Sequence, residues 1–273
     1  MPIVEILPNG GKSYMTYPAP TRPQPLRGVT SGWSRDVARR NSDFLMSVQV
    51  EQLTGSGYAL SLTLKDCPAT PQDWQKVRRA FVERLRRLGM LRLHWLTEWQ
   101  RRQVPHLHAA VWFDRPQDPA RILMHWLAVA APYRAGPHSQ HCTEIRGTVG
   151  WFEYLAKHAA RSVRNYQRSP ENVPRQWAGV TGRMWGRIGS WPVSEAKQVE
   201  IPWGPWWRYR RRMIHYQLAK ARRQGDSARY RYLKAYRKRA PKVTSRSQPV
   251  PRFWIPEEDQ WQLLMNSLRP EDQ

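Results

Sequence analysis

The chain has 273 residues, and its 45 lysines and arginines outnumber 21 aspartates and glutamates, for a formal net charge of +24. Hydrophobic residues make up 40% of the chain and it contains 15 tryptophans, so the composition excludes a disordered protein and the charge belongs to a folded surface. Such a surface suits a polyanionic partner, because phosphates release counterions when lysine and arginine bind them. Charge alone does not distinguish DNA from RNA.

The cysteines and the N-terminus bear on where the protein works. Cys67 and Cys142 are far apart and neither belongs to a Cys-x-x-Cys pair, which argues against a disulfide framework or a zinc knuckle. The N-terminus lacks the charged start and apolar run of a signal peptide. No stretch approaches the roughly twenty apolar residues of a membrane span. We therefore expect a soluble intracellular protein without a membrane partner.

The first third of the chain predicts an arm, a helix, a strand and a second helix. Residues 1–29 are rich in proline and glycine and predict an irregular arm. A helix is expected from Ser34 to about Leu53, and the alternating, β-rich residues 57–66 predict a strand. Thr70 is then expected to cap a helix that opens with a proline and ends near Gly89.

The middle of the chain completes an α+β pattern. Residues 91–99 and 106–113 are apolar and alternating, and a short polar turn joins them, so they predict a β-hairpin. Helices are expected around residues 118–131 and 148–166. The order predicts an α+β domain over residues 30–195, with a central antiparallel sheet and flanking helices laid on one face.

The last part of the chain has a different composition. Residues 196–240 predict a basic, aromatic helical extension, and residues 241–273 predict a Pro/Ser-rich linker followed by a short amphipathic helix at 256–268. Guanidinium groups can meet phosphates while aromatic faces stack on bases. Alternatively the aromatic residues pack against the fold, which we expect of Trp206 and Trp207. The candidate DNA-binding residues of this extension are Arg208, Arg210, Arg211, Arg212, Arg222 and Arg223.

A candidate metal site lies in the predicted hairpin. His106 and His108 are one residue apart in a strand, so both imidazoles point to the same face. If the hairpin closes simply, Glu98 lies across from His106. Two imidazoles and a carboxylate make a three-ligand site with open positions, suited to Mg²⁺ or Mn²⁺ bound together with a substrate phosphate. The alternative is that the histidines are structural residues of the sheet.

The helix at 148–166 has a polar side as well as an apolar one. Tyr154, Lys157, His158 and Arg161 gather on the polar side at helical spacing. A lysine one turn after a tyrosine stabilises the phenolate, and the neighbouring cations are candidates for binding an anion. An ordinary amphipathic surface helix gives the same pattern, so the position of this helix after the histidine strand is what distinguishes it.

Three ordered motifs resemble those of the HUH endonucleases, in particular the rolling-circle replication initiators (Rep proteins). The segment PHLHAAVWF resembles their His-hydrophobic-His motif, and ALSLTL resembles the strand motif that precedes it. YLAK at 154–157 resembles their Tyr-x-x-Lys motif. The resemblance covers about residues 32–192, where GWS near Trp33 and GRMWGRIG at 182–189 are similar to initiators of filamentous phages and related plasmids.

The resemblance implies a site-specific, metal-dependent endonuclease that nicks and rejoins single-stranded origin DNA in a bacterial cytoplasm. It implies that His106 and His108 hold a divalent metal with Glu98 as the acidic ligand. Tyr154 would attack the scissile phosphate and become joined to the 5′ end, while Lys157 positions or activates the reacting groups. Many relatives carry a second tyrosine on this helix. Here the nearby residue is His158, which predicts a single-tyrosine enzyme.

Three other interpretations stay open. A relaxase places its tyrosine before the histidine motif, where Tyr14 and Tyr17 are the candidates. A single-tyrosine transposase shares the motifs, and a non-catalytic nucleic-acid-binding protein would share only the charge. Residues 10–13 (GGKS) lack the earlier glycine of a phosphate-binding loop, since Ile6 stands there, so a host helicase and a polymerase would be required as partners.

Overall fold

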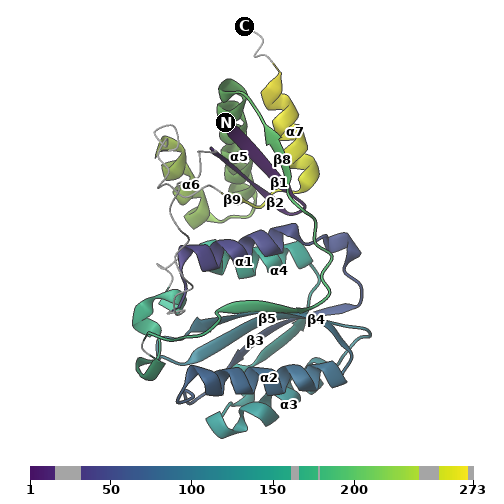
Figure 1. Ribbon diagram of the computed structural model, residues 1–273, viewed down its shortest axis with the longest axis vertical. Coiled ribbons are helices and arrows are strands. Elements are labelled where there is room, and N and C mark those ends of the chain that lie inside the picture. Colours follow the sequence, from purple (N-terminus) through teal and green to yellow (C-terminus); the bar gives the residue numbers. More distant parts are fainter. Residues whose placement is uncertain (16–31, 161–165, 178, 240–251, 270–273) are drawn as a thin grey trace, which may run out of the picture. The chain divides into compact units, whose positions relative to one another are not determined.

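The protein is described from a computed structural model that covers residues 1–15, 32–160, 166–177, 179–239 and 252–269 (Figure 1). It is an α+β protein with two antiparallel sheets, as predicted. The chain divides into two compact units. The central unit comprises Pro23–Leu45 and Val50–Pro192, and the terminal unit comprises Met1–Arg22, Met46–Gln49 and Val193–Gln273.

The central unit is built on a five-stranded antiparallel sheet in the order β6-β3-β5-β4-β7. The predicted strand and hairpin are confirmed as β3, β4 and β5. The edge strands β6 and β7 were not predicted, because one is short and polar and the other contains two glycines. The strands span Ser56–Thr63 (β3), Met90–Trp99 (β4), Pro105–Phe113 (β5), His141–Glu144 (β6) and Trp185–Gly189 (β7).

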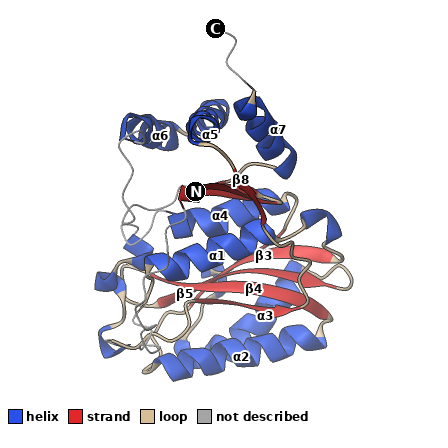
Figure 2. Cartoon of the chain, turned by 45° about the horizontal axis from the view of Figure 1, so that its top comes forward, coloured by secondary structure: helices blue, strands red, loops and turns tan. Residues whose placement is uncertain are grey.

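Helices cover both faces of this sheet, so the prediction of helices on one face is wrong. One face carries α1 (Arg35–Ser47) and α4 (Thr148–Ala160). The other carries α2 (Pro71–Arg87) and α3 (Pro119–Ala130), as Figures 1 and 2 show. The reason lies in the strands: eight successive residues at the end of β4 are buried, and a strand buried on both sides needs cover on both sides.

The start of α2 was predicted correctly, whereas the end of α1 was not. The Thr70 hydroxyl accepts a hydrogen bond from the backbone N–H of Asp73, with Pro71 at the start of α2, as predicted. The first helix was expected to reach Leu53 but ends at Ser47, because Val48 forms a β-bridge with Val193 instead. α4 is described to Ala160, and residues 161–165 of the predicted helix lie outside the described part.

The terminal unit joins both ends of the chain in one four-stranded sheet of order β8-β1-β2-β9. The prediction of an irregular arm is therefore wrong for residues 2–15, which form a β-hairpin. Residues 16–29 of that arm and 241–251 of the predicted linker lie outside the described part. The strands are Pro2–Leu7 (β1), Gly10–Met15 (β2), Lys197–Glu200 (β8) and Arg252–Phe253 (β9), and the helices are Trp203–Arg223 (α5), Ser227–Arg239 (α6) and Glu257–Leu268 (α7).

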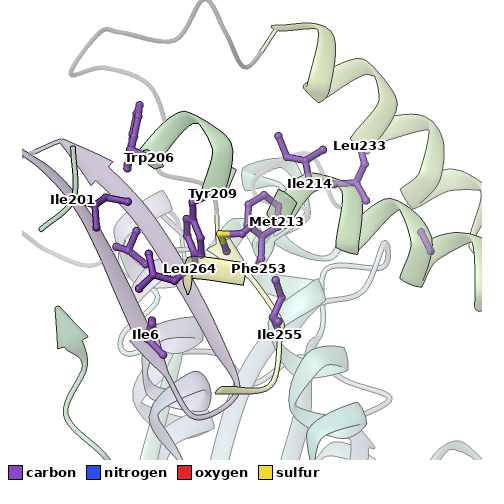
Figure 3. Packing of buried hydrophobic residues seen from close by; sticks show 12 residues of the cluster. Ile6, Ile201, Trp206, Tyr209, Met213, Ile214, Leu233, Phe253, Ile255 and Leu264 are labelled. Carbon is purple, nitrogen blue, oxygen red and sulfur yellow. The ribbon is translucent and has the colours of Figure 1, made fainter. Parts of the chain in front are cut away.

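The hairpin is stabilised because its apolar side chains pack against the helices that follow β8. Val4 and Ile6 belong to the same buried cluster as Tyr209 and Met213 of α5 and Leu264 of α7 (Figure 3). The glycines that suggested an arm allow close packing in β2, since a Cβ on Gly11 would collide with a glutamine side chain of α7. The predicted basic helices and C-terminal helix are confirmed, but as parts of a unit that includes the N-terminus.

None of the described helices is both long enough and apolar enough to cross a membrane.

The role of the N-terminal hairpin can be tested by shortening one buried side chain. Ile6 is 1% exposed, so Ile6→Ala should lower the free energy of unfolding by about 2–5 kcal/mol. Met265→Ala on α7, where the side chain is 55% exposed, is the control and should change little. Urea unfolding followed by circular dichroism measures both. Equal stability of the two variants would mean that residues 2–15 do not contribute to the core.

Candidate active site

The register of the β4–β5 hairpin places the predicted site residues on one face of the sheet. Glu98 lies directly opposite His106, as predicted. The rings of His106 and His108 are 4.4 Å apart between centroids and almost perpendicular. The Nε2 atom of His108 is 3.5 Å from Oε2 of Glu98, and both side chains are almost completely buried. The three residues are therefore neighbours in space.

A serine of the next strand orients the second histidine. Ser61 lies opposite His108 in the β3–β5 pairing, and its hydroxyl is 2.9 Å from Nδ1 of the imidazole. With Nδ1 engaged by the hydroxyl, Nε2 is the nitrogen directed at Glu98. The side-chain amide of Gln100 is 3.5 Å from Nδ1 of His106. Sequence reasoning missed Ser61, although its place in the ALSLTL motif was a signal.

Glu98 is also half of a buried ion pair. The Nε–H of Arg168 donates to Oε1 of Glu98 at 2.6 Å, and neither side chain is exposed. The guanidinium carbon of Arg168 lies 3.8 Å from the centre of the Trp33 ring. Burial raises the pKa of Glu98, and the charge of Arg168 opposes that rise. No local pattern around residue 168 indicated this contact, because it depends on how the 3-10 helix Tyr166–Arg168 packs against β4.

Tyr154 stands beside the histidines. The apolar side of α4, including Phe152, Leu155 and Ala156, is buried as predicted. Tyr154 remains 38% exposed, and its ring centroid is 5.9 Å from that of His108. Trp151 stacks on the tyrosine ring, with 4.8 Å between centroids. The predicted nucleophile is thus accessible at the edge of the histidine cluster and is held in place by an aromatic neighbour.

The donor set fits a divalent metal only in part. Two donors about 2.1 Å from one ion lie roughly 3–4 Å apart, which matches the His108–Glu98 spacing of 3.5 Å. Within the described ranges, however, no three His, Cys, Asp or Glu side chains are arranged so that they could hold one ion. Binding by His106, His108 and Glu98 together therefore requires side-chain movement, and Arg168 shares the carboxylate.

Several predicted residues cannot be placed. The side chains of Lys157, His158 and Tyr166, and residues Arg161 and Tyr17, lie outside the described part of the chain. Tyr14, the other relaxase candidate, lies in β2 of the terminal unit and donates a hydrogen bond to Glu5 at 3.1 Å. Burial and the Glu5 carboxylate raise the pKa of Tyr14, which disfavours its phenolate.

The arginines of α5 differ in exposure. Arg210 is 5% exposed, with its guanidinium over the rings of Trp206 and Trp207, so packing occupies it. Arg208 donates to the backbone carbonyl of Ser267. Trp206 is buried, which agrees with its interpretation as a packing residue. The candidates that remain exposed for DNA are Arg211, Arg212, Arg222 and Arg223.

A third histidine of the sheet is structural. His94 is fully buried, its Nε2–H donates a hydrogen bond to Oδ1 of Asn41 at 2.7 Å, and its ring stacks on Phe44. Burial lowers the pKa of His94 to about 3, so the imidazole is neutral at physiological pH. Its position shows that a histidine on this face need not belong to the site.

Comparison with known proteins shows the family to which the chain belongs. The family model described as replication-associated protein ORF2/G2P matches residues 57–163, which include all of β3 but its first residue, the histidine strand β5 and Tyr154. The chain belongs to this family of replication-associated proteins. It is 46% identical to a protein of Xylella fastidiosa strain 9a5c that is named as a replication protein, over 94% of this chain and 93% of the relative.

Two further relatives are similar over almost their whole lengths. A protein of Xylella fastidiosa strain Temecula1, also named as a replication protein, is 44% identical over 92% of this chain and 97% of its own length. The replication-associated protein G2P of Pseudomonas phage Pf3 is 44% identical over 90% of this chain and 89% of its own length. No solved structure matches.

The buried ion pair can be tested by removing one partner. Arg168→Ala should lower the free energy of unfolding by about 3–5 kcal/mol, because it leaves the Glu98 carboxylate buried without its counter-charge. The double replacement Glu98→Gln with Arg168→Met should recover most of that loss, since it leaves no buried charge. Urea unfolding compares the variants. A loss below about 1 kcal/mol for Arg168→Ala would show that the pair is worth no more than a surface one.

Proposed function

We propose that this protein nicks and rejoins one strand of single-stranded origin DNA, with Tyr154 as the nucleophile, and so initiates rolling-circle replication of a plasmid or phage. The observation that carries the proposal is the position of the exposed Tyr154 ring 5.9 Å from that of His108. The two residues come from different elements, and packing of α4 on the sheet brings them together. Membership of the replication-associated family supports the same process.

The chemistry assigned to Tyr154 is a transesterification. Its hydroxyl oxygen forms a bond to phosphorus, and the bond from phosphorus to the 3′ oxygen breaks. The phenolic proton is lost and the 3′ oxygen gains a proton, so the products are a 5′-phosphotyrosine and a free 3′-hydroxyl. That hydroxyl can prime a polymerase, and the reverse reaction rejoins the strand. A host helicase and a host polymerase would complete the process.

His106, His108 and Glu98 would hold a divalent ion, Mg²⁺ or Mn²⁺. When bound, such an ion polarises a phosphoryl oxygen and helps orient the scissile bond. Ser61 fixes the ring of His108 through Nδ1 and thereby directs Nε2 toward the Glu98 carboxylate. Arg168 holds that carboxylate from its other oxygen. The role of these neighbours is to limit how far the donor atoms move when an ion binds.

The residues that follow Tyr154 supply positive charge in this proposal. Lys157 comes one turn later in α4, at the spacing that places two side chains on the same side of a helix. A lysine there would stabilise the phenolate or the transferring phosphoryl group. His158 and Arg161 are assigned to binding the DNA strand.

The nucleophile is tested by removing a single oxygen atom. Tyr154→Phe keeps the ring that stacks on Trp151, so stability should change little while cleavage of an origin oligonucleotide should be lost. In the unmodified protein, mass spectrometry should find the DNA joined to the peptide that contains Tyr154, through the 5′-phosphate at the break. Retained cleavage by Tyr154→Phe would refute this assignment.

The site of any adduct also separates the alternatives. An adduct on Tyr14 or Tyr17 would indicate a relaxase, and one on Tyr166 would keep the reaction but change the nucleophile. Absence of an adduct with either Mg²⁺ or Mn²⁺ would favour a non-catalytic DNA-binding protein. Joining of the cleaved strand to an unrelated target, rather than religation at the origin, would indicate a transposase.

The metal assignment makes a separate prediction. His106→Ala or His108→Ala should abolish nicking but leave oligonucleotide binding largely intact, because phosphate contacts dominate that affinity. Glu98→Ala should weaken Mn²⁺ affinity by about 10- to 100-fold, measured by calorimetry. His125→Ala is the matched control, since His125 lies on α3 at the opposite face of the sheet. Full metal-dependent nicking by the double histidine variant would contradict the assignment.

A further inference from the structure

A cavity of about 520 Å³ lies on the face of the central sheet that α2 covers. The floor of the cavity consists of apolar residues of the sheet, among them Leu93 and Trp95 of β4 and Leu107 of β5, and α2 contributes Phe81 and Val82 to the lining. The sheet residues alternate with His94, Glu98 and His108, so they point to the opposite face from the candidate active site. The cavity is therefore separate from the Tyr154 site, although both belong to the central unit.

The wall of the cavity is an arginine stacked on a tryptophan. The guanidinium carbon of Arg78, on α2, is 3.6 Å from the centre of the Trp95 ring. Gly186 pairs with Trp95 across the strands, and a Cβ there would come within 2.8 Å of the indole. The glycine thus lets the indole lie close over β7. The result is a fixed stack of ring and guanidinium, a surface of the kind that proteins offer to nucleobases.

Arginines outnumber carboxylates in the lining of this cavity. Arg78 and Arg79 of α2 line it together with Arg183, and their mutual repulsion adds to burial in lowering the pKa of Arg78 to about 9. Among the described residues, no carboxylate pairs with these arginines, and the buried Nε–H of Arg78 has no hydrogen-bond acceptor. The lining carboxylate, Glu83, is engaged by Arg86.

Crowded and partly desolvated like charges cost free energy, and a bound anion would remove that cost. The volume exceeds what a phosphate ion needs and falls in the range of small-molecule sites, about 300–1,000 Å³. A ligand with an anionic group for the arginines and an apolar, planar part for the floor matches both features. A nucleotide has this combination.

We propose that this cavity binds one nucleotide of the single-stranded DNA substrate, with its phosphate on Arg78, Arg79 and Arg183 and its base against the apolar floor. The inference rests on the proposed function for the identity of the strand. It assigns to the α2 face a DNA anchor that is distinct from the cleavage site.

The test removes two cavity arginines that are exposed and do not hold the fold. Arg79→Gln with Arg183→Gln is compared with Arg87→Gln with Arg115→Gln, which removes the same charge from exposed residues outside the cavity. The probe is a fluorescent single-stranded oligonucleotide of mixed sequence, followed by anisotropy with the full chain. Two lost phosphate contacts on a single strand should reduce the log–log salt slope by about 1.4 and weaken binding about 20-fold near 0.1 M salt.

The control pair should bind within about twofold of the unmodified protein at the same salt concentration, about 0.1 M. Equal weakening of both pairs would overturn the proposal, because it would reflect overall charge only. An oligonucleotide carrying 5-iodouracil should also crosslink to the peptide that contains Trp95 or Phe81. If thymidine monophosphate stabilises the protein against heating through these arginines while oligonucleotide binding is unchanged, the cavity takes free nucleotides and the proposed strand anchor is wrong.

The outcome is independent of the nicking reaction. At saturating oligonucleotide, the cavity variant should still form the Tyr154 adduct, because its active-site face is unaltered. Loss of that adduct in the cavity variant alone would overturn the separation of the two sites. Absence of the adduct already in the unmodified protein would refute the proposed function, whereas the binding comparison would still measure the cavity.

Discussion

The antiparallel register between β4 and β5 is the constraint on which the rest of the central unit depends. With Glu98 opposite His106, the even-numbered residues of β5 and of β4 from Arg92 onward face α1 and α4, and the odd-numbered residues of the same stretches face α2 and α3. A slip of one residue would exchange the two sets, because side chains alternate along a strand. The candidate active site and the arginine-lined cavity are therefore two consequences of one pairing, on opposite faces of the same strands.

The buried Glu98–Arg168 pair then connects the active-site face to the 3-10 helix Tyr166–Arg168, which is distant in sequence. An ion pair without solvent is costly to form, and removal of one member is more costly still. The two oxygens of the Glu98 carboxylate have different neighbours: Oε1 accepts a hydrogen bond from Arg168, and Oε2 faces the imidazole of His108. Trp33, which stacks on the guanidinium, extends this support to the segment before α1.

Sequence patterns predicted the parts of the fold that depend on local chemistry. Thr70 and Pro71 at the start of α2, the alternating strands and the apolar side of α4 each carry a periodicity or capping signal that acts over a few residues. Local patterns did not predict the N-terminal hairpin, since its strands become buried only against α5 and α7 from the other end of the chain. Arg210, predicted to contact DNA, is likewise buried by tryptophans of its own helix.

The sequence by itself determined the α+β class, the hairpin, the shared face of His106 and His108, and the candidacy of Tyr154, because strand and helix periods decide which neighbours along a chain point the same way. Only the tertiary structure decided that helices cover both faces of the sheet, that Arg168 pairs with Glu98, and that three arginines meet Trp95 around a cavity. Each of these depends on contacts between segments far apart in sequence. Such contacts form when the elements pack together, and the periodicity of a single strand or helix does not predict them.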